Sequence, residues 1–390
     1  MIYVHIPFCR SFCTYCDFYS EIASSSCRSR ESFDAYFRAL GREVELRSAE
    51  IRENLVTPGA VNTLYIGGGT PSVLPLSVFR HLLEALHNVG VGKSFREFTV
   101  EVNPDDIVEK GHSYVEGLLD MGVSRISMGV QSFDDGILKW MNRRHDAEAA
   151  VKAYRILEEA GMENISIDLI FGLPQLSDTL WQETLEKALT ISSKGNLPKH
   201  ISSYQLSVEP GSALAQLMEQ GKWAEASEEL CSRQYDRLCA SLKTAGYHHY
   251  EISNFALPGY EAVHNSAYWN HVPYVGLGPG AHSFVVRDDA YVRRWNNPDL
   301  NEYLKAVNKG DMSLASGSED LSEEQIVMEK IMLGLRTSFG VSKSLLMGAC
   351  SPQNVLSAIS DGDLESVGND SLRIPESRFF VSDAIIMSII

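Results

Sequence analysis

Six short runs rich in β-branched and aromatic residues alternate with helical patterns through the first half of this 390-residue chain. They recur at intervals of roughly thirty to forty residues, a usual span for a strand–helix unit. Strands that alternate with helices predict an α/β fold with a parallel sheet, and six units are too few for a complete eight-fold barrel. The pattern leaves a partial (βα)6 barrel and an open doubly wound sheet as competing architectures. The predicted strands are Ile2–Ile6, Val61–Ile66, Phe98–Val102, Arg125–Val130, Ile165–Phe171 and Ile201–Leu206.

Helices are predicted between these strands wherever apolar residues recur at three- and four-residue spacing. Examples are Phe33–Ile51, Val78–Val89, Ala147–Ala160 and Leu180–Ile191. After about residue 250 the alternation weakens, and glycine, proline, asparagine and aromatic residues dominate. We therefore expect three parts, a barrel over residues 1–245, a barrel-edge extension over 246–300, and a small helical or winged-helix-like domain over 301–390.

The composition argues against several classes of protein. A net charge of −17 disfavours a nucleic-acid partner, because phosphate contacts need clustered lysine and arginine. No apolar run reaches the roughly 18 residues of a membrane span, and the start lacks the basic region of a secretory signal. Seven cysteines, an odd number with three crowded together, favour a reducing compartment over a disulfide framework. We expect a cytoplasmic protein, or one of an organelle matrix or stroma if a targeting segment precedes this sequence.

Three cysteines near the start, Cys9, Cys13 and Cys16, fit on one short loop and can converge on a soft metal centre. A structural zinc site takes four protein ligands, and iron–sulfur clusters are commonly held by four cysteines. Three thiolates would leave one iron of a cubane open to an exogenous ligand, which points to chemistry at the cluster. The alternative is a zinc site completed by His5 or Cys27.

Unusual residues follow the predicted strands at their carboxyl ends, where the active site of a parallel α/β fold forms. The second strand leads into Gly67-Gly-Gly-Thr-Pro71, in which glycine allows close backbone approach and exposes N–H donors. Glu101, Gln131 and Asp168 lie at the ends of the next three strands. Each of these features has a plainer interpretation, as a tight turn, a strand-end cap or a solvated side chain. Their joint occurrence at one edge, downstream of the cysteine loop, indicates a binding site.

The cysteine spacing, with Tyr15 just before the last cysteine and a glycine-rich strand end downstream, resembles that of radical S-adenosylmethionine (SAM) enzymes. A fuller set of motifs is similar to the oxygen-independent coproporphyrinogen III oxidase group and covers about residues 1–340, whereas the last fifty residues match only loosely. The motifs are Tyr3-Val-His-Ile-Pro-Phe-Cys9, Gly67-Gly-Gly-Thr-Pro71, Glu101-Val-Asn-Pro104, Gly129-Val-Gln-Ser-Phe133, Asn142-Arg143 and Ile167-Asp-Leu-Ile-Phe-Gly-Leu-Pro174.

This resemblance implies a division of labour among the residues. The three cysteines would ligate a [4Fe–4S] cluster, and the amine and carboxylate of SAM would chelate its open iron. An electron from a donor such as a ferredoxin or flavodoxin would then cleave SAM to a 5′-deoxyadenosyl radical. Tyr15 can stack on the adenine. The remaining SAM contacts would come from Tyr3, Gly68, Gly69 and Thr70 at the methionine end and from Glu101, Gln131, Arg143 and Asp168 around the rest of the pocket.

Two branches of this family share the same core, the oxidase itself and a heme chaperone that delivers heme to acceptor hemoproteins. The oxidase pattern has a further cysteine two residues after the third ligand, where this chain has Phe18. The oxidase also has a segment before the first strand that is absent here, but a truncation would produce the same difference. The run His264-Asn-Ser-Ala-Tyr-Trp269 resembles the chaperone's heme-binding signature.

The physics of that signature supports heme binding, because a neutral imidazole is a common axial ligand of heme iron. His264 would bind the iron, and Tyr268 and Trp269 would pack on the macrocycle. On its own the motif is more simply a loop anchored to the core, and His282 in a glycine-rich loop is a weaker candidate. Together with Phe18, the motif makes the heme chaperone the expected function and the oxidase the alternative. No catalytic residue is assigned, and a homodimer is compatible with the resemblance.

Overall fold

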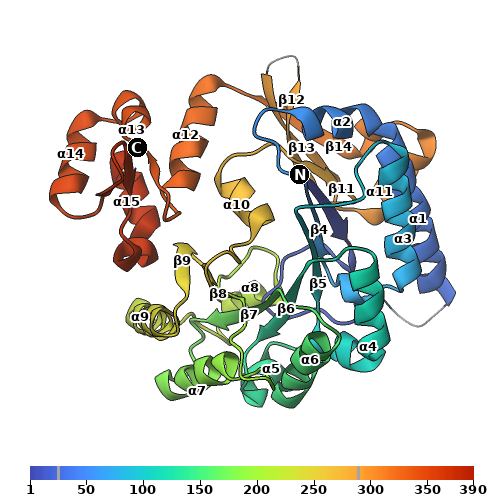
Figure 1. Ribbon diagram of the computed structural model, residues 1–390, viewed down its shortest axis with the longest axis horizontal. Helices are drawn as coiled ribbons and strands as arrows, with labels where there is room; N and C mark the ends of the chain where they lie inside the picture. Colours follow the sequence, from blue (N-terminus) through green and yellow to red (C-terminus); the bar gives the residue numbers. More distant parts are fainter. Residues whose placement is uncertain (24–26, 288–289) are drawn as a thin grey trace.

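The central sheet has nine strands and carries six parallel strands that pair in the order in which they occur along the chain (Figure 1). The computed structural model describes the backbone of residues 1–23, 27–287 and 290–390, and the side chains of these residues outside 27–32. Because each strand pairs with the next, no reversal of strand order occurs, and the connecting helices cover one face of the sheet. This is the predicted partial (βα)6 barrel rather than a doubly wound sheet. The six strands are β1 (Ile2–Ile6), β4 (Thr63–Gly68), β5 (Glu97–Val102), β6 (Arg125–Gln131), β7 (Ile165–Phe171) and β8 (His200–Gln205).

These strands agree with the sequence predictions to within two residues at each end. Their two faces differ in character, as β7 illustrates. Ile165, Ile167 and Leu169 are buried beneath the helices, whereas Ser166 and Asp168 point to the opposite face. The interior of the barrel is therefore lined by polar side chains. The helices on the outer face are α3 (Leu76–Asn88), α4 (Pro104–Asp120), α5 (Asp135–Trp140), α6 (Ala147–Glu159), α7 (Asp178–Leu189) and α9 (Glu228–Thr244).

The connection from β1 to β4 differs from its prediction. The sequence predicts one helix over Phe33–Ile51, but the chain forms α1 (Cys27–Leu46) and α2 (Ser48–Val56). The break falls at Arg47, whose backbone leaves the helical region at φ −102° and ψ 18°. The Arg47 side chain is buried and makes tertiary contacts that no local periodicity encodes.

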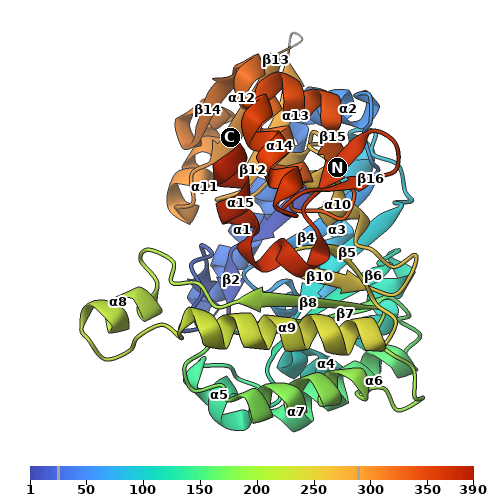
Figure 2. The same cartoon turned by 90° about the vertical axis from the view of Figure 1, so that its left-hand side faces the viewer.

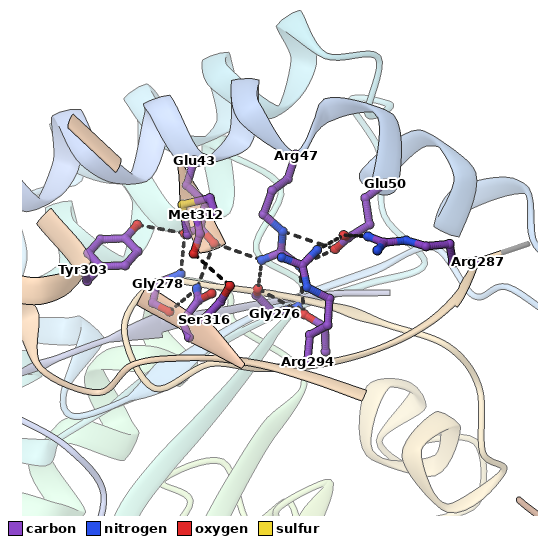
Figure 3. A network of polar contacts seen from close by, with 12 residues as sticks. Glu43, Arg47, Glu50, Gly276, Gly278, Arg287, Arg294, Tyr303, Met312 and Ser316 are labelled. Carbon is purple, nitrogen blue, oxygen red and sulfur yellow. Dashed lines mark hydrogen bonds and ion pairs between the residues drawn. The ribbon is translucent and has the colours of Figure 1, made fainter. Parts of the chain in front are cut away.

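Those contacts form a polar network that joins α1 to the edge of the sheet beside β1 (Figure 3). Arg47 donates to the Gly276 carbonyl oxygen at 2.6 Å and to Ser283 Oγ at 2.9 Å, and it pairs with Glu43 at 2.9 Å and with Glu50. Glu43 is fully buried and accepts a hydrogen bond from the backbone N–H of Gly278 at 2.8 Å. The network thus fixes the segment around β11 (Val275–Leu277), which extends the sheet beside β1.

A second, antiparallel sheet follows at this edge, and the sequence analysis did not predict it. It consists of β12 (His282–Arg287), β13 (Ala290–Asn296) and β14 (Ser316–Leu321). The helix α10 (Val263–Trp269) precedes it, and α11 (Leu300–Lys309) packs on α1. The boundary predicted at residue 301 therefore falls within a helix that contacts the barrel. At the other edge, β10 (Asn254–Ala256) and β9 (His248–Glu251) pair in antiparallel fashion after β8.

The C-terminal part is small and separate in appearance, at the upper left of Figure 1. It combines helices with a three-stranded antiparallel sheet in the order β15–β17–β16, in keeping with the predicted helical or winged-helix-like domain. None of the helices in the described part of the chain has the length and apolar character needed to cross a bilayer. The elements are α12 (Glu323–Gly334), β15 (Val341–Ser342), α13 (Lys343–Ala349), α14 (Pro352–Ser360), β16 (Glu365–Val367), β17 (Ser371–Arg373) and α15 (Ser382–Ile389).

Candidate functional site

The cysteine loop leaves the carboxyl end of β1 and is held by hydrogen bonds to the turn after α5 and to α8 (Ala213–Glu219). Thr14 N–H donates to the Met141 carbonyl oxygen at 3.1 Å, and Asn142 Nδ2 donates to the Phe12 carbonyl oxygen at 2.7 Å. From the other side, the N–H of Leu214 donates to the Thr14 carbonyl oxygen at 2.9 Å. Leu214 belongs to α8, which projects from the barrel in Figure 2. The loop is thus fixed, while its three cysteines are free thiols and partly exposed.

A chain of polar contacts joins two of these cysteines through the strand ends. Cys9 Sγ lies 3.4 Å from Thr70 Oγ1, to which Asn103 Nδ2 donates at 3.4 Å. Arg143 donates to Asn103 Oδ1 at 2.7 Å and to Cys13 Sγ at 3.4 Å. The guanidinium can therefore offset the negative charge of thiolate ligands. Sequence reasoning missed Asn103, although it stands between Glu101 and Pro104 in a motif already singled out.

The two metal interpretations of the cysteine loop differ in what they require of its neighbours. His5 has both ring nitrogens engaged, Nδ1 with the Tyr3 hydroxyl and Nε2 with the Tyr19 carbonyl oxygen, each at 3.0 Å. The Cys27 side chain lies outside the described residues. Within the described side chains, no three of His, Cys, Asp or Glu converge closely enough for a single metal ion. In a cubane each thiolate binds a different iron atom, so the sulfur atoms stand apart, and the free cysteines beside Arg143 fit that group.

Two carboxylates face the barrel interior from neighbouring positions. Glu101 accepts hydrogen bonds from the Tyr65 hydroxyl at 2.6 Å and from the Gly68 N–H at 3.1 Å. Burial, together with the negative charge of Asp168, raises the pKa of Glu101 to about 7. Burial also raises the pKa of Asp168, which accepts from Ser127 Oγ at 3.1 Å. Both side chains remain partly exposed, so they can accept from the hydroxyl or ammonium groups of a ligand.

The glycine turn after β4 packs closely against the start of the cysteine loop. Gly68 adopts φ +104°, and a Cβ at that position would lie 2.5 Å from His5 Nδ1. A Cβ on Gly69 would lie 2.7 Å from the Phe8 carbonyl oxygen. The N–H groups of Gly68, Gly69 and Thr70 all donate within the protein, to Glu101, Ile6 and Phe8. These three N–H donors seat the turn in this structure, and the contact of Gly68, Gly69 and Thr70 with the amino-acid end of SAM stays a prediction.

The other predicted SAM residues lie along the same polar edge. Gln131 has φ +70° at an irregularity in the pairing of β6 with β7, an uncommon conformation for a residue other than glycine. Such strain persists where the surrounding structure enforces it, often at functional sites. Burial raises the pKa of the Tyr15 hydroxyl, which lies among Arg143, Cys13 and Cys16. Tyr3 projects from β1 toward Tyr65, with ring centroids 6.1 Å apart.

The histidine of the predicted heme motif is buried. His264 is 1% exposed, and its Nδ1 lies 2.8 Å from Thr63 Oγ1, while its Nε2 lies 3.0 Å from the Tyr268 hydroxyl. Burial lowers the pKa of His264 to about 3, so the ring is neutral. Both ring nitrogens are thus occupied in this structure. Tyr268 and Trp269 are partly exposed, and Phe18 in the cysteine loop is 64% exposed.

A pH dependence of stability follows from the raised pKa of Glu101. Between about pH 4.5 and 7 the folded chain holds a proton on Glu101 that the unfolded chain has lost, so stability falls as the pH rises through this window. We expect Glu101→Gln to remove at most about 3 kcal/mol of this loss in the cofactor-free protein. Urea unfolding at several pH values measures the difference from the parent chain. The exposed Glu116→Gln on α4 is the control, and equal pH profiles for parent and Glu101→Gln would contradict the prediction.

Comparisons with known proteins bear on this site. The family model described as the radical SAM superfamily matches residues 3–188, which include the cysteine loop and the first five strands of the barrel. The heme chaperone HemW of Lactococcus lactis is 35% identical over 339 residues, covering 87% of this chain and 82% of the relative. HemW of Bacillus subtilis is 34% identical, covering 87% and 84%. A mitochondrial radical S-adenosyl methionine domain-containing protein 1 of Danio rerio is 31% identical, covering 87% and 73%.

Among solved structures, coproporphyrinogen III oxidase (HemN) of Escherichia coli, described as a radical SAM enzyme, aligns with a TM-score of 0.77. The alignment covers 99% of this chain and 89% of HemN at 22% sequence identity, a level that shows a shared fold. The likeness therefore extends over the C-terminal part, where sequence motifs match only loosely. With its three-cysteine loop, its partial barrel and HemW relatives above 30% identity, the chain belongs to the HemW heme chaperone family of the radical SAM superfamily.

Proposed function

We propose that this protein binds a [4Fe–4S] cluster and SAM and carries heme to acceptor hemoproteins. The observation that carries the proposal is the contact chain from Cys9 through Thr70, Asn103 and Arg143 to Cys13. It brings a thiolate site and polar strand ends together in one place. Heme is proposed as the cargo because the chain belongs to the HemW heme chaperone family.

The family motifs and this geometry together support the assignment of residues. Cys9, Cys13 and Cys16 would ligate the cluster, and Arg143 would offset part of its negative charge. When bound, the cluster and SAM supply one-electron chemistry that is the cofactors' own. Glu101 and Asp168 would accept from ribose hydroxyls or the SAM ammonium, and Tyr15 would pack on the adenine. Tyr3, Gly68, Gly69, Thr70 and Gln131 would shape the rest of the SAM pocket.

The alternative function is decarboxylation of coproporphyrinogen III, the activity named for the structural neighbour HemN. The shared fold makes this a real alternative, since the barrel is the same. Phe18 disfavours it, because the oxidase pattern has a cysteine at that position. Phe18 is also exposed beside the cluster loop, where an apolar side chain can contact a cargo.

The test combines two assays on the anaerobically reconstituted protein. In the first, dithionite and SAM are added with and without coproporphyrinogen III; in the second, hemin is titrated and then offered an apo-hemoprotein. We expect stoichiometric hemin binding and transfer, with no protoporphyrinogen formed at catalytic turnover. Turnover of coproporphyrinogen III would replace the chaperone with the oxidase.

The six described cysteines outside position 27 are free thiols, which suits a reducing compartment such as a cytoplasm, matrix or stroma. A reducing compartment also supplies the low-potential electron donor that a radical SAM cluster would use, such as a ferredoxin or flavodoxin. We propose this setting for the protein, with heme acceptors in the same compartment. Copurification of the chain with such a donor under anaerobic conditions would support it.

A further inference from the structure

A cavity of about 370 Å³ opens at the β1 edge of the barrel, beside the cysteine loop. Its walls come from five separate stretches of the chain, including the loop after Cys16, the helix α10 and the second sheet. We call it the aromatic cavity, after six of the aromatic and histidine side chains that line it. They are Tyr3, Phe18, Tyr268, Tyr274, His282 and Trp295.

His282 is the histidine of this cavity whose ring is available. The other histidine in the wall, His5, has both nitrogens engaged by Tyr3 and Tyr19. His282 is exposed, and no hydrogen bond joins its ring to any side chain or backbone group that the structure describes. Partial burial of the ring and the positive charge of Arg293 lower the pKa of His282, so the ring is neutral at neutral pH. A neutral imidazole has the lone pair that a heme iron needs.

The position of His282 is rigid because β12 is fixed on both sides. His282 lies opposite Trp295 in the pairing of β12 with β13, and the two ring planes are inclined by 28° with centroids 6.3 Å apart. A Cβ on Gly276 would lie 1.9 Å from the His282 carbonyl oxygen, so β11 passes directly beneath this residue. Arg47 holds the same segment through Gly276 and Ser283 (Figure 3). The imidazole is therefore presented on a preorganised strand.

Trp295 is likewise held in place by its neighbour on β14. A Cβ on Gly317 would lie 2.4 Å from Trp295 Cε2, so the indole lies directly over the glycine backbone. Aromatic walls of this kind suit a flat apolar macrocycle. The volume lies within the range of about 300–1,000 Å³ that is usual for small-molecule sites. A cavity toward the lower end of that range leaves an edge of a large ligand outside, as transfer to an acceptor requires.

We propose that the aromatic cavity binds the heme and that His282, rather than His264, supplies an axial ligand to its iron. This inference rests on the proposed function, since it places the cargo of that function. His264 then acts as a positioning residue, because its Nε2 holds the hydroxyl of Tyr268 in the cavity wall at 3.0 Å. Tyr3 belongs both to this wall and to the predicted SAM pocket, so the heme would lie next to SAM.

The experiment compares His282→Gly, His264→Ala and a control, His81→Ala, which removes an exposed histidine on α3 outside the cavity. Each reconstituted protein is titrated with hemin, followed by Soret absorbance and by electron paramagnetic resonance of the ferric iron. We expect His282→Gly to lose the histidine-ligated spectrum and to bind hemin about tenfold more weakly or worse. Added imidazole should restore the spectrum by occupying the vacated position. The control should match the parent chain, and His264→Ala should keep the spectrum with weaker binding.

The outcomes distinguish a failure of the proposed function from a failure of the His282 assignment. A parent chain that binds no hemin would overturn the proposed function itself. A parent chain that binds hemin, together with an unchanged spectrum in His282→Gly, would overturn only the assignment of His282. Loss of the histidine signature in His264→Ala alone would return the ligand to His264. Circular dichroism checks folding, and Trp295→Leu, which keeps His282 but removes an aromatic wall, should weaken hemin binding without altering the ligand spectrum.

Discussion

Serine in place of Cys13 is expected to abolish cluster binding, with iron after anaerobic reconstitution falling from about four atoms per chain to less than about one. Only three cysteines are available on the loop, so the loss of one leaves two ligands for a cubane. Cys13 is also the thiol that Arg143 contacts, so its charge compensation is lost at the same time. Iron and acid-labile sulfide analyses measure the effect, and SAM binding by calorimetry should disappear in parallel.

Cys239→Ser is the matched control, because Cys239 is another free and partly exposed cysteine, located on α9 away from the loop. It should retain the full iron content of the parent chain. If Cys13→Ser keeps its iron, the cluster is not held by this loop. Stoichiometric zinc in an anaerobically purified parent chain that refuses iron would have the same meaning.

Alanine in place of Arg47 is expected to lower the free energy of unfolding by about 3–5 kcal/mol, the usual cost of removing one partner of a buried ion pair. Arg47 is 6% exposed and Glu43 is fully buried. Without the guanidinium, the Glu43 carboxylate stays buried without its charge partner, and the Gly276 carbonyl oxygen and Ser283 Oγ lose a donor. Urea denaturation followed by circular dichroism gives the difference from the parent chain.

Arg42→Ala, on α1 one turn before the break at Arg47, provides the comparison. Arg42 pairs with Glu45 at 2.6 Å, but both side chains are more than half exposed, so the pair is screened by water and contributes little. We expect its unfolding midpoint to stay close to that of the parent chain. Equal losses for Arg47→Ala and Arg42→Ala would show that burial of the network in Figure 3 does not stabilise the fold.

Local periodicity was enough to predict the six strands because each of them has one apolar face that must meet a helix, but it left the barrel and the doubly wound sheet as alternatives. The strands Ile165–Phe171 and Arg125–Gln131 show this pattern; the first has the predicted bounds, and the second is one residue longer than the predicted Arg125–Val130. Periodicity could not find the break at Arg47, since that break exists to let a side chain reach residues more than two hundred positions away. It also missed the sheet of β12 to β14, where Ser283-Phe-Val-Val-Arg287 and Tyr291-Val-Arg-Arg-Trp295 lie within a region dominated by loop-forming residues.

The sequence by itself determined where the barrel strands lie along the chain, the three-cysteine loop and the family motifs, because spacing along the chain encodes all of them. The order of the strands in the sheet came from the structure. Only the tertiary structure decided which histidine is free. His264 meets Thr63 from 201 positions away and is buried, whereas His282 meets Phe18 and Tyr268 across one cavity. The sequence carries no record of these distances, since burial and hydrogen bonding arise from the packing of remote segments. Phe18 was singled out from the sequence. The fold places it in the wall of the aromatic cavity, in which we propose that heme binds.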